Sequence, residues 1–469
     1  CSVDILPPAG GAKWRVITGL TPERGVRRLG FGTYQAHDYD ELIDCPVQMG
    51  EFEHIRFDVL GVPHELAVTG RVPKLDMNRL VADLARVCDQ QIRLFEPRRR
   101  KAPFERYIFM TLAVGEGYGG LEHRNSTALI CRRDDLPFTG MKDATEGYRN
   151  FLGLASHEYF HSWNVKRIRP AAFVPYDLTQ ENYTRLLWAF EGFTSYYDDL
   201  LLARCGLLTS AQYLDTLGKT MTTVLQRSGR LKQSVAESSF DAWIKYYRQD
   251  ENAPNSVVSY YQKGALIGLA LDLVIRAETR GRRSLDDVMR LLWQQWKRAS
   301  DYRGIAEDEF IVAAEQASGL VLAPLIREWT EGTRDPDFAR LLKPFGIEAM
   351  QRPAVDSVAL ALLGVQLAPG ADCRLAHVHD GTPAQAAGLS AGDVVIAVGG
   401  LRATPGNFDK LLLRYAPGDQ VELVGFRRDE LMQTDVALAQ RPPLKTTLVT
   451  DPRSKTAAVR LRRGWLGHS

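Results

Sequence analysis

The stretch ASHEYFHSW, residues 155–163, places His157 and His161 four positions apart, with Glu158 directly after the first histidine. On a helix, positions i and i+4 share one face, so both imidazoles can bind one cation. Glu158 then lies about 100° further round the helix axis, beside the open position of the metal. This spacing, HExxH, predicts a metal site with His157 and His161 as ligands and Glu158 as the general base.

The third ligand of this site is expected on the next helix, in WAFEGFTSYY, residues 188–197. A catalytic zinc ion needs three protein ligands and one position for water. Glu191 lies among aromatic residues, where an unpaired carboxylate would be costly to bury. We therefore expect Zn²⁺ bound by His157, His161 and Glu191, which would activate a water whose proton Glu158 accepts. The alternatives that spacing leaves open for the third ligand are Glu181, Asp198 and Asp199.

Helical periodicity surrounds this stretch from about residue 148 to residue 335 and predicts a helical domain. Ser284 and Asp287 form a capping-box pattern at the start of one of its helices. Before this domain, a helix is expected over residues 77–95, capped by Asp76, with strands over 106–114 and 127–133. These elements indicate a sheet packed on a helix.

The two ends of the chain lack this helical periodicity. Residues 1 to about 75 alternate short apolar runs with Gly, Pro and Asp, as β-strands do. After Pro344, short Val, Leu and Ala runs continue to about residue 440 and predict a separate small β-rich domain. The basic residues that follow are expected to form a solvated tail.

The composition excludes several classes of protein. The chain has 469 residues, with 59 Lys and Arg against 57 Asp and Glu, and this balance gives no sign of nucleic-acid binding. No apolar stretch reaches the roughly 20 residues of a transmembrane helix. The six cysteines lie far apart, which favours isolated thiols and a cytoplasmic location. The chain opens at Cys1 without Met, as expected of a processed or truncated product whose targeting segment is missing, so the compartment stays open.

Two further motifs fail on their context. GEGYGG, residues 115–120, fits the glycine pattern of a dinucleotide-binding turn, but a strand pattern follows it where a helix is required. GLSAG, residues 388–392, fits the serine-hydrolase elbow, yet Ser390 leads through a turn into a strand. We therefore expect neither nicotinamide binding nor a serine nucleophile.

HEYFHSW followed by WAFEGFTSYY resembles the gluzincin metallopeptidases, and specifically the M61 family of glycyl aminopeptidases. Two further patterns of that family are matched, by Gly119 to His123 and by Tyr261 to Gly264. The resemblance covers nearly the whole chain. The N-terminal β domain of the family is normally longer, so residues 1–55 are expected to be only its remainder.

The resemblance also implies roles for residues outside the metal site. Tyr261 matches the catalytic tyrosine, whose hydroxyl stabilises the tetrahedral oxyanion, with Tyr260 as the nearby rival. Glu122, with Gly119 and Gly120, matches the segment that binds the free α-amine of the substrate. The implied substrates are peptides with a small N-terminal residue, Gly or Ala.

The segment GTPAQAAGLSAGDVVIAVGG, residues 381–400, closely resembles part of a PDZ domain. In such domains a loop of backbone amides binds the C-terminal carboxylate of a peptide, which adds to the edge of the sheet. The alternative is a small β domain with a purely structural role. The residues that match the carboxylate-binding loop are Leu363, Gly364, Val365 and Gln366.

Together these observations predict a multidomain α+β zinc metallopeptidase, an aminopeptidase hydrolysing the N-terminal residues of peptides. The alternatives are a PDZ-guided zinc endopeptidase and a peptide-binding scaffold without turnover. The predicted segments are residues 1–55, the remainder of the N-terminal β domain; 56–345, a thermolysin-like catalytic domain with a sheet and a helical half; 350–440, the PDZ domain; and 441–469, the basic tail.

Overall fold

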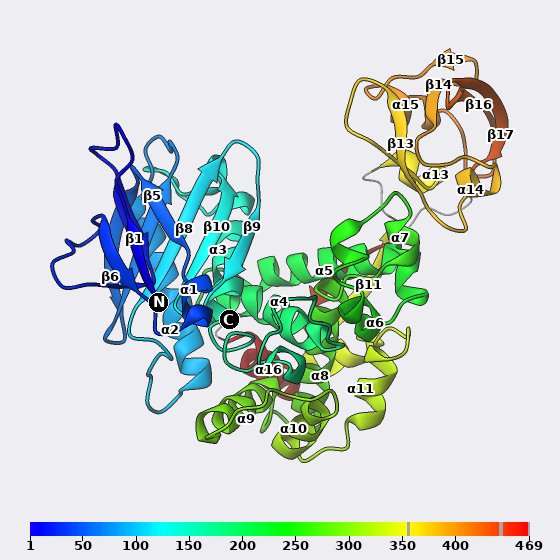
Figure 1. The fold of residues 1–469 in the computed structure, drawn as a ribbon. Helices are drawn as coiled ribbons and strands as arrows, with labels where there is room; N and C mark the ends of the chain where they lie inside the picture. The colour runs from blue at the N-terminus through cyan, green and yellow to red at the C-terminus, as the bar shows by residue number, and fades with distance from the viewer. Residues whose placement is uncertain (354–356, 440–443, 468–469) are drawn as a thin grey trace.

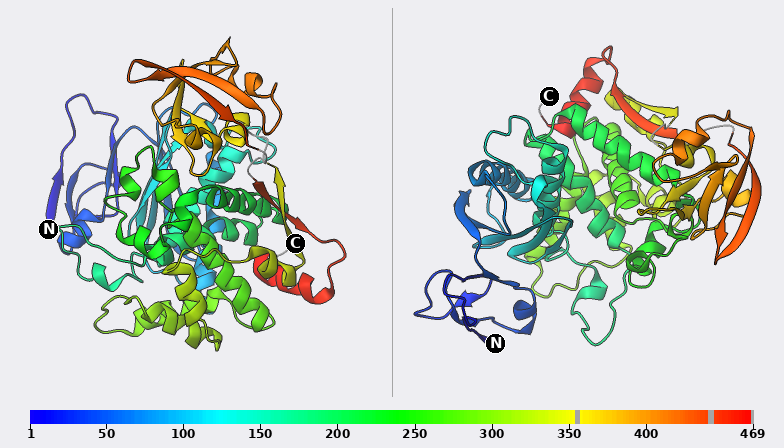
Figure 2. Two further views of the ribbon diagram at one scale, coloured as in Figure 1. Left: turned by 90° about the vertical axis from the view of Figure 1, so that its right-hand side faces the viewer. Right: turned by 90° about the horizontal axis from the view of Figure 1, so that it is seen from above.

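The computed structural model describes residues 1–353, 357–439 and 444–467. Figure 1 shows β-rich regions at two ends of the molecule and a helical region between them. In the right-hand view of Figure 2, the first residues and the small C-terminal β module lie on opposite sides of the helices. The expected mixture of helices and sheets in several parts is therefore confirmed. None of the helices in the described ranges is long and apolar enough to cross a membrane.

The first fifty residues form a small β region with its own core. Its buried side chains include Ile5, Val16 and Tyr34. One sheet has the order β1-β4-β3, and β2 pairs with β5 beside it. The elements are β1 (Ser2–Ile5), β2 (Arg15–Thr18), β3 (Thr21–Pro22), β4 (Gly32–Gln35), α1 (Tyr39–Ile43) and β5 (Val47–Gly50).

A five-stranded sheet follows, in the order β6-β7-β8-β10-β9. Strands β7, β8 and β10 are parallel, whereas β9 returns antiparallel along β10 and forms the edge of the sheet. Helix α2 begins after Asp76, whose side chain accepts a hydrogen bond from the Arg79 amide. The expected helix and strands are confirmed. Their bounds are β6 (Glu53–Val59), β7 (Val62–Thr69), α2 (Met77–Phe95), β8 (Tyr107–Val114), β9 (Gly119–Glu122) and β10 (Ser126–Arg132).

The helical region contains the predicted capping box, since Ser284 and Asp287 exchange their hydrogen bonds at the start of α9. Helix α4 packs against both α3 and α8. The helices are α3 (Glu146–Phe160), α4 (Leu187–Arg204), α5 (Ser210–Gln226), α6 (Val235–Phe240), α7 (Ala253–Ser256), α8 (Gln262–Glu278), α9 (Leu285–Arg298), α10 (Glu309–Ser318), α11 (Ala323–Thr330) and α12 (Phe338–Leu342).

Two glycines bring α4 and α8 unusually close. A Cβ atom on Gly192 would lie 2.5 Å from the Cα of Gly264, a separation that no side chain allows. Glu191 precedes Gly192, and Tyr261 lies just before the first turn of α8. The close crossing therefore brings Glu191 and Tyr261 near each other.

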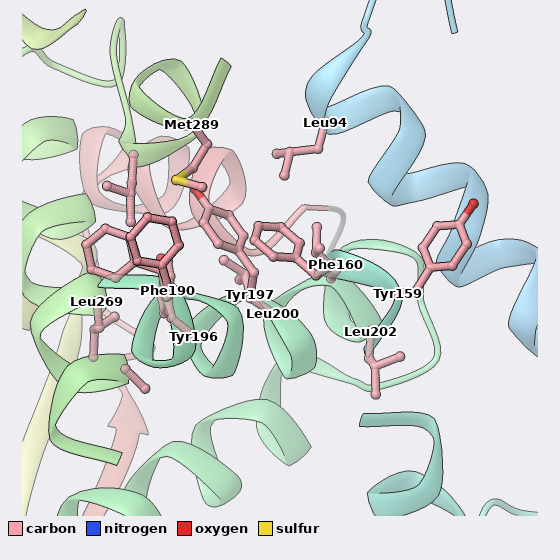
Figure 3. Packing of buried hydrophobic residues seen from close by; sticks show 14 of the residues in the cluster. Leu94, Tyr159, Phe160, Phe190, Tyr196, Tyr197, Leu200, Leu202, Leu269 and Met289 are labelled. Carbon is pink, nitrogen blue, oxygen red and sulfur yellow. The ribbon is translucent and has the colours of Figure 1, made fainter. Parts of the chain in front are cut away.

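Buried aromatic side chains fix α3 against α4. Figure 3 shows this packing, with Phe160 of α3 beside Tyr197 of α4. The two rings are stacked, with centroids 5.0 Å apart. Because such interiors are close-packed, the relative position of the two helices is well determined.

The C-terminal module is an insertion between two paired strands, β11 (Ile347–Pro353) and β18 (Leu444–Thr450). Its sheet has the order β12-β13-β14-β16-β17, and it encloses a separate hydrophobic core. The predicted boundary between residues 440 and 441 lies outside the described residues. The elements of the module are α13 (Val358–Leu362), β12 (Val365–Leu367), β13 (Cys373–Val378), α14 (Pro383–Ala386), β14 (Val394–Val398), β15 (Leu401–Arg402), α15 (Phe408–Leu412), β16 (Gln420–Arg427) and β17 (Glu430–Ala437).

The prediction of a solvated basic tail is wrong for residues 444–467. After β18, helix α16 (Thr456–Leu466) returns to the helical region. Trp465 is fully buried, and its Nε1 donates a hydrogen bond of 2.9 Å to the hydroxyl of Tyr196. The guanidinium of Arg462 donates to the carbonyl of Phe345 at 2.9 Å, so basic residues of this segment also bind backbone carbonyls. Leu448, Trp465 and Leu466 of this segment thus belong to the core of the helical region.

Candidate active site

Helix α3 positions the HExxH residues. The helix begins at Glu146, and the side chain of Thr145 caps it by accepting a hydrogen bond from the Tyr148 amide. His157 and Glu158 lie in its last turn, and His161 is the residue that ends it. The centroids of the two imidazole rings are 4.7 Å apart, so both rings lie on one face, as the i and i+4 spacing predicts.

The carboxylate of Glu191 on α4 meets both imidazoles. Its Oε2 lies 3.3 Å from Nε2 of His157 and 3.2 Å from Nε2 of His161. These ligand atoms form a group that can hold a metal ion. The structure thus brings together the three residues expected as ligands.

The other nitrogen of each imidazole is held by a neighbour. Nδ1 of His157 lies 3.2 Å from Oδ2 of Asp198, and Nδ1 of His161 lies 2.7 Å from the carbonyl oxygen of Asn164. Partners of this kind fix the ring orientation of metal-binding histidines and direct Nε2 at the cation. Asp198, one of the alternative ligands, therefore lies behind His157, on the side away from Glu191.

The other two alternative ligands are placed elsewhere. The side chain of Glu181 is exposed. Asp199 lines a separate cavity of about 340 Å³ beside α5. Its carboxylate faces the backbone of Gly153, where a Cβ would lie 3.0 Å from Oδ1.

The electrostatics of the three residues favour a bound cation. Burial by itself would lower the pKa of His157, but hydrogen bonds with Asp198 and Glu191 raise this pKa well above its ordinary value. Burial would raise the pKa of Glu191, yet the two histidines hold it far below its ordinary value. A field that favours positive charge on the imidazoles also favours a divalent cation between them. Two imidazoles and one carboxylate are a donor set that zinc accepts, so the residues present fit this metal.

Glu158 is buried beneath the edge strand β9. Its Oε2 has no hydrogen-bond partner among the described residues, and burial raises the pKa of its carboxyl to about 7. A Cβ on Gly120 would lie only 2.2 Å from Oε1 of Glu158. Glycine at this position is therefore needed for β9 to pass over the carboxylate.

The carboxylate of Glu122, at the end of β9, lies near Glu158 and His161. This carboxylate forms a second potential cation-binding group with Glu158 and His161, in which the ligand atoms all lie within 4.8 Å of one another. Gly119 begins the strand and pairs with Ile130 of β10. The glycine-rich segment thus continues into a strand and not into a helix, as expected from its context.

Asp44 of the N-terminal region forms an ionic cluster with the residues that directly follow β9. Nδ1 of His123 lies 3.5 Å from Oδ1 of Asp44, and Nζ of Lys166 lies 2.6 Å from the same oxygen. The Arg124 amide donates to Oδ2 of Asp44 at 2.9 Å. Asp44 therefore helps to position Glu122. Local sequence patterns do not mark Asp44, because its partners are about 80 and 120 residues away.

Tyr261 lies at the start of α8, on the other side of His157, with 6.3 Å between their ring centroids. Its hydroxyl is 2.8 Å from the hydroxyl of Tyr247. Burial raises the pKa of Tyr261 far above its ordinary value, so this hydroxyl keeps its proton. The rival Tyr260 is fully buried and stacks on Tyr261 with centroids 4.7 Å apart. Tyr247 was not predicted, since an exposed tyrosine in a short 3-10 helix gives no signal in the sequence.

The predicted peptide-binding loop lies in the C-terminal module, and two of its backbone amides form hydrogen bonds within the module. The amide of Leu363 donates to the carbonyl of Ala359 at 3.0 Å, and the amide of Gly364 donates to the same oxygen at 3.1 Å. Both groups therefore close the end of α13, and the prediction that they bind a carboxylate is not supported. Val365 and Gln366 begin β12 at the edge of the sheet.

The module also contacts the segment that leads to Tyr261. The amide nitrogen of the Asn255 side chain donates to the carbonyl of Val378 at 2.8 Å, and the backbone amide of Asp380 donates to Oδ1 of Asn255 at 3.0 Å. Lys232 forms an ion pair with Asp380. None of the predicted metal ligands or acid–base residues lies in the module.

The comparison with protein families matches two parts of the chain. The model of the M61 glycyl aminopeptidases matches residues 150–267, which include most of α3, all of α4 and Tyr261. The model of the peptidase M61 N-terminal domain matches residues 1–51. No curated protein matches the sequence.

Solved structures add one strong likeness. An aminopeptidase N family protein from Idiomarina loihiensis is 38% identical, with a TM-score of 0.93 over 100% of this chain and 79% of that chain. The M1 zinc metallopeptidase from Deinococcus radiodurans is a much weaker match, 14% identical with a TM-score of 0.45 over 71% of this chain and 63% of that chain. At 38% identity over the whole chain, the protein belongs to the family of that aminopeptidase N family protein, and two of its segments match models of M61 peptidases.

Proposed function

We propose that this peptidase is a zinc-dependent aminopeptidase. The observation that carries the proposal is the convergence of Glu191 Oε2 on both Nε2 atoms, at 3.3 and 3.2 Å, while Asp198 and the Asn164 carbonyl hold the opposite nitrogens. His157, His161 and Glu191 would hold the ion. Zinc at this position would polarise the peptide carbonyl and lower the pKa of a water molecule to about 7.

Glu158 is proposed as the general base and then the general acid. Its carboxylate is buried, and burial raises its pKa to about 7, which suits a group that must accept and return a proton near neutral pH. The unpartnered Oε2 leaves one oxygen available for that proton. Hydrolysis then needs no covalent intermediate.

Tyr261 is proposed to donate a hydrogen bond to the oxyanion. The hydroxyl stays protonated, and Tyr247 fixes its direction from 2.8 Å away. Such a donor, aimed in advance at the developing charge, stabilises the transition state more than the substrate. Tyr260 is a weaker candidate because its side chain is fully buried.

Glu122 is proposed to bind the free α-ammonium group of the substrate. Its carboxylate lies within 4.8 Å of ligand atoms of Glu158 and His161, so an amine bound there would place the first peptide bond at the reaction centre. Gly119 and Gly120 supply the backbone of the edge strand beside it. This arrangement favours removal of one N-terminal residue over internal cleavage, and Gly or Ala at that position follows from the family resemblance.

For the C-terminal module we propose a PDZ-type fold with a structural role. Its separate core and the engagement of the Leu363 and Gly364 amides support this role. Guidance of an endopeptidase by a bound peptide C-terminus is the weaker alternative.

The metal proposal is tested by elemental analysis of the purified protein and of two variants. We expect one zinc ion per chain in the parent and in Glu181→Gln, whose site lies on the surface, and loss of zinc in Glu191→Gln. Absence of stoichiometric metal in the parent, with no activity restored by added zinc, would remove the proposed role of the three ligands.

A further inference from the structure

A second cavity shares no residue with the candidate active site. Its volume is about 1120 Å³, and it lies where the end of α2 meets one side of α9 and the end of α10. Both α9 and α10 are at the lower edge of the molecule in Figure 1. A hollow of this size can take a ligand as large as a nucleotide.

The walls of this cavity are strongly basic. Two carboxylates line it, Glu96 and Asp287, whereas the whole chain carries a net charge of only +2. The cationic side chains that line it are Arg98, Arg99, Arg283, Arg290, Lys297 and Arg298. A cleft lined by one sign of charge concentrates ligands of the opposite sign.

The two carboxylates are already neutralised by other groups. Glu96 accepts a hydrogen bond of 2.8 Å from Nε1 of Trp293 and forms an ion pair with Lys297. Asp287 accepts one of 2.9 Å from Arg290 and also caps α9. Arg283 also lies 3.9 Å from Oδ1 of Asp287, so these two acids account for Arg283, Arg290 and Lys297 but not for Arg98, Arg99 or Arg298.

Stabilisation of helix ends explains only part of the charge. Arg290 donates to the carbonyl of Leu94, near the end of α2, at 2.9 Å, and Lys297 lies in the last turn of α9, where a cation is favourable. Arg98 and Arg99 follow the end of α2 and are exposed. Within residues 1–353, 357–439 and 444–467, no carboxylate forms an ion pair with Arg98, Arg99 or Arg298.

We propose that this basic cavity binds a compact ligand with several phosphate groups. Three unpaired guanidinium groups in one hollow suit charges that lie close together, because each can donate two parallel hydrogen bonds to a phosphate. Trp296 also lines the cavity and is stacked on Trp293, with centroids 4.8 Å apart. This indole offers an aromatic surface for a planar base, so the phosphates can belong to a nucleotide or to an inorganic chain.

Isothermal titration at fixed low ionic strength tests the proposal, with inorganic tripolyphosphate and ATP as the probes. We expect saturable binding of one ligand per chain, and at least about 100-fold weaker binding in R98A/R99A/R298A, since three charged hydrogen-bond donors are lost. The lysine variant R98K/R99K/R298K keeps the charge and should recover only part of the affinity. Tighter binding of ATP than of tripolyphosphate would assign the ligand to the nucleotides. Equal binding of the two probes would assign the ligand to the inorganic phosphate chains.

The matched control is R24A/R27A/R414A, which removes the same charge from exposed arginines elsewhere. It should bind both probes like the parent, and all variants should keep the melting temperature of the parent without ligand. The proposal is wrong if neither probe binds saturably, if the control loses as much affinity as the test variant, or if citrate binds as tightly as tripolyphosphate. Zinc content and peptide hydrolysis do not enter the readout, so failure here leaves the proposed peptidase function unaffected.

Discussion

Substitution of Gly192 by alanine should disable the candidate active site without touching any of its side chains. The added Cβ would lie 2.5 Å from the Gly264 Cα, 2.6 Å from its carbonyl carbon and 2.9 Å from the Tyr260 carbonyl oxygen. All three neighbours are backbone atoms, which cannot rotate away as a side chain can. Helices α4 and α8 would therefore have to separate.

The size of that displacement follows from ordinary contact distances. Non-bonded carbon atoms pack at about 3.5–4.0 Å, so the two helices must move apart by about 1 Å. Overpacking of this kind lowers the free energy of unfolding by about 1–3 kcal/mol. The better helix propensity of alanine offsets up to about 1 kcal/mol of this loss. Glu191 moves with α4 and Tyr261 with α8, and a misplacement of about 1 Å can lower catalytic efficiency by about 100-fold.

The assay compares Gly192→Ala with Gly464→Ala, a glycine inside α16 whose added Cβ would meet only one atom, Arg276 Nη1 at 3.9 Å. The first variant should unfold at a lower temperature, lose kcat/KM on an aminoacyl amide and bind zinc more weakly. The second should match the parent in all three measurements. Parent-like activity and zinc content in Gly192→Ala would refute the claim that the close helix crossing sets the geometry of the site.

Glu158→Gln should keep zinc but lower kcat by roughly 100- to 10,000-fold, since the amide cannot accept a proton, while Glu116→Gln on the neighbouring exposed turn should be unaffected; comparable rates in both would remove Glu158 from the mechanism. Burial would raise the pKa of Asp44, but His123 and Lys166 hold it at about 2. An unfolded aspartate titrates near pH 3.9, so the ionised Asp44 stabilises the fold above about pH 4, and this contribution is lost as the pH falls towards 2. Asp44→Asn should thus reduce the free energy of unfolding by roughly 2 kcal/mol at pH 7 and by much less near pH 2, and an equal loss at both pH values would contradict the ionic role. Replacement of residues 357–439 by a short flexible linker between β11 and β18 should leave zinc binding and hydrolysis of a dipeptide-sized substrate intact; complete loss of hydrolysis with zinc still bound would mean that the Asn255 contacts hold the Tyr261 segment in place.

Local patterns predicted the parts of the site that lie on one helix or one turn. His157, Glu158 and His161 are close in sequence, and their helical spacing alone predicts their shared face. Glu191 was favoured because an acid among aromatic residues needs a partner, although the spacing left other acids open. Tyr261 and Glu122 came only from the family resemblance.

Long-range partners could not be predicted from local patterns. Asp44 contacts His123 and Lys166 across a large part of the chain, and nothing near Asp44 in sequence marks it as buried. The many arginines of α16 predict a solvated tail, because the apolar residues between them are few. The burial of Trp465 depends on the pairing of β18 with β11, which brings the chain back after the inserted module.

The most direct test of the central claim compares a free and a blocked N-terminus on the same substrate. The zinc-loaded parent protein is assayed on alanine amide and glycine amide and on their N-acetylated forms, with Glu122→Ala as the matched variant. The account predicts rapid hydrolysis of the free amines, no measurable hydrolysis of the acetylated forms, and a raised KM in Glu122→Ala with unchanged zinc content. Equal hydrolysis of free and acetylated substrates by the parent would contradict the aminopeptidase assignment and favour an endopeptidase.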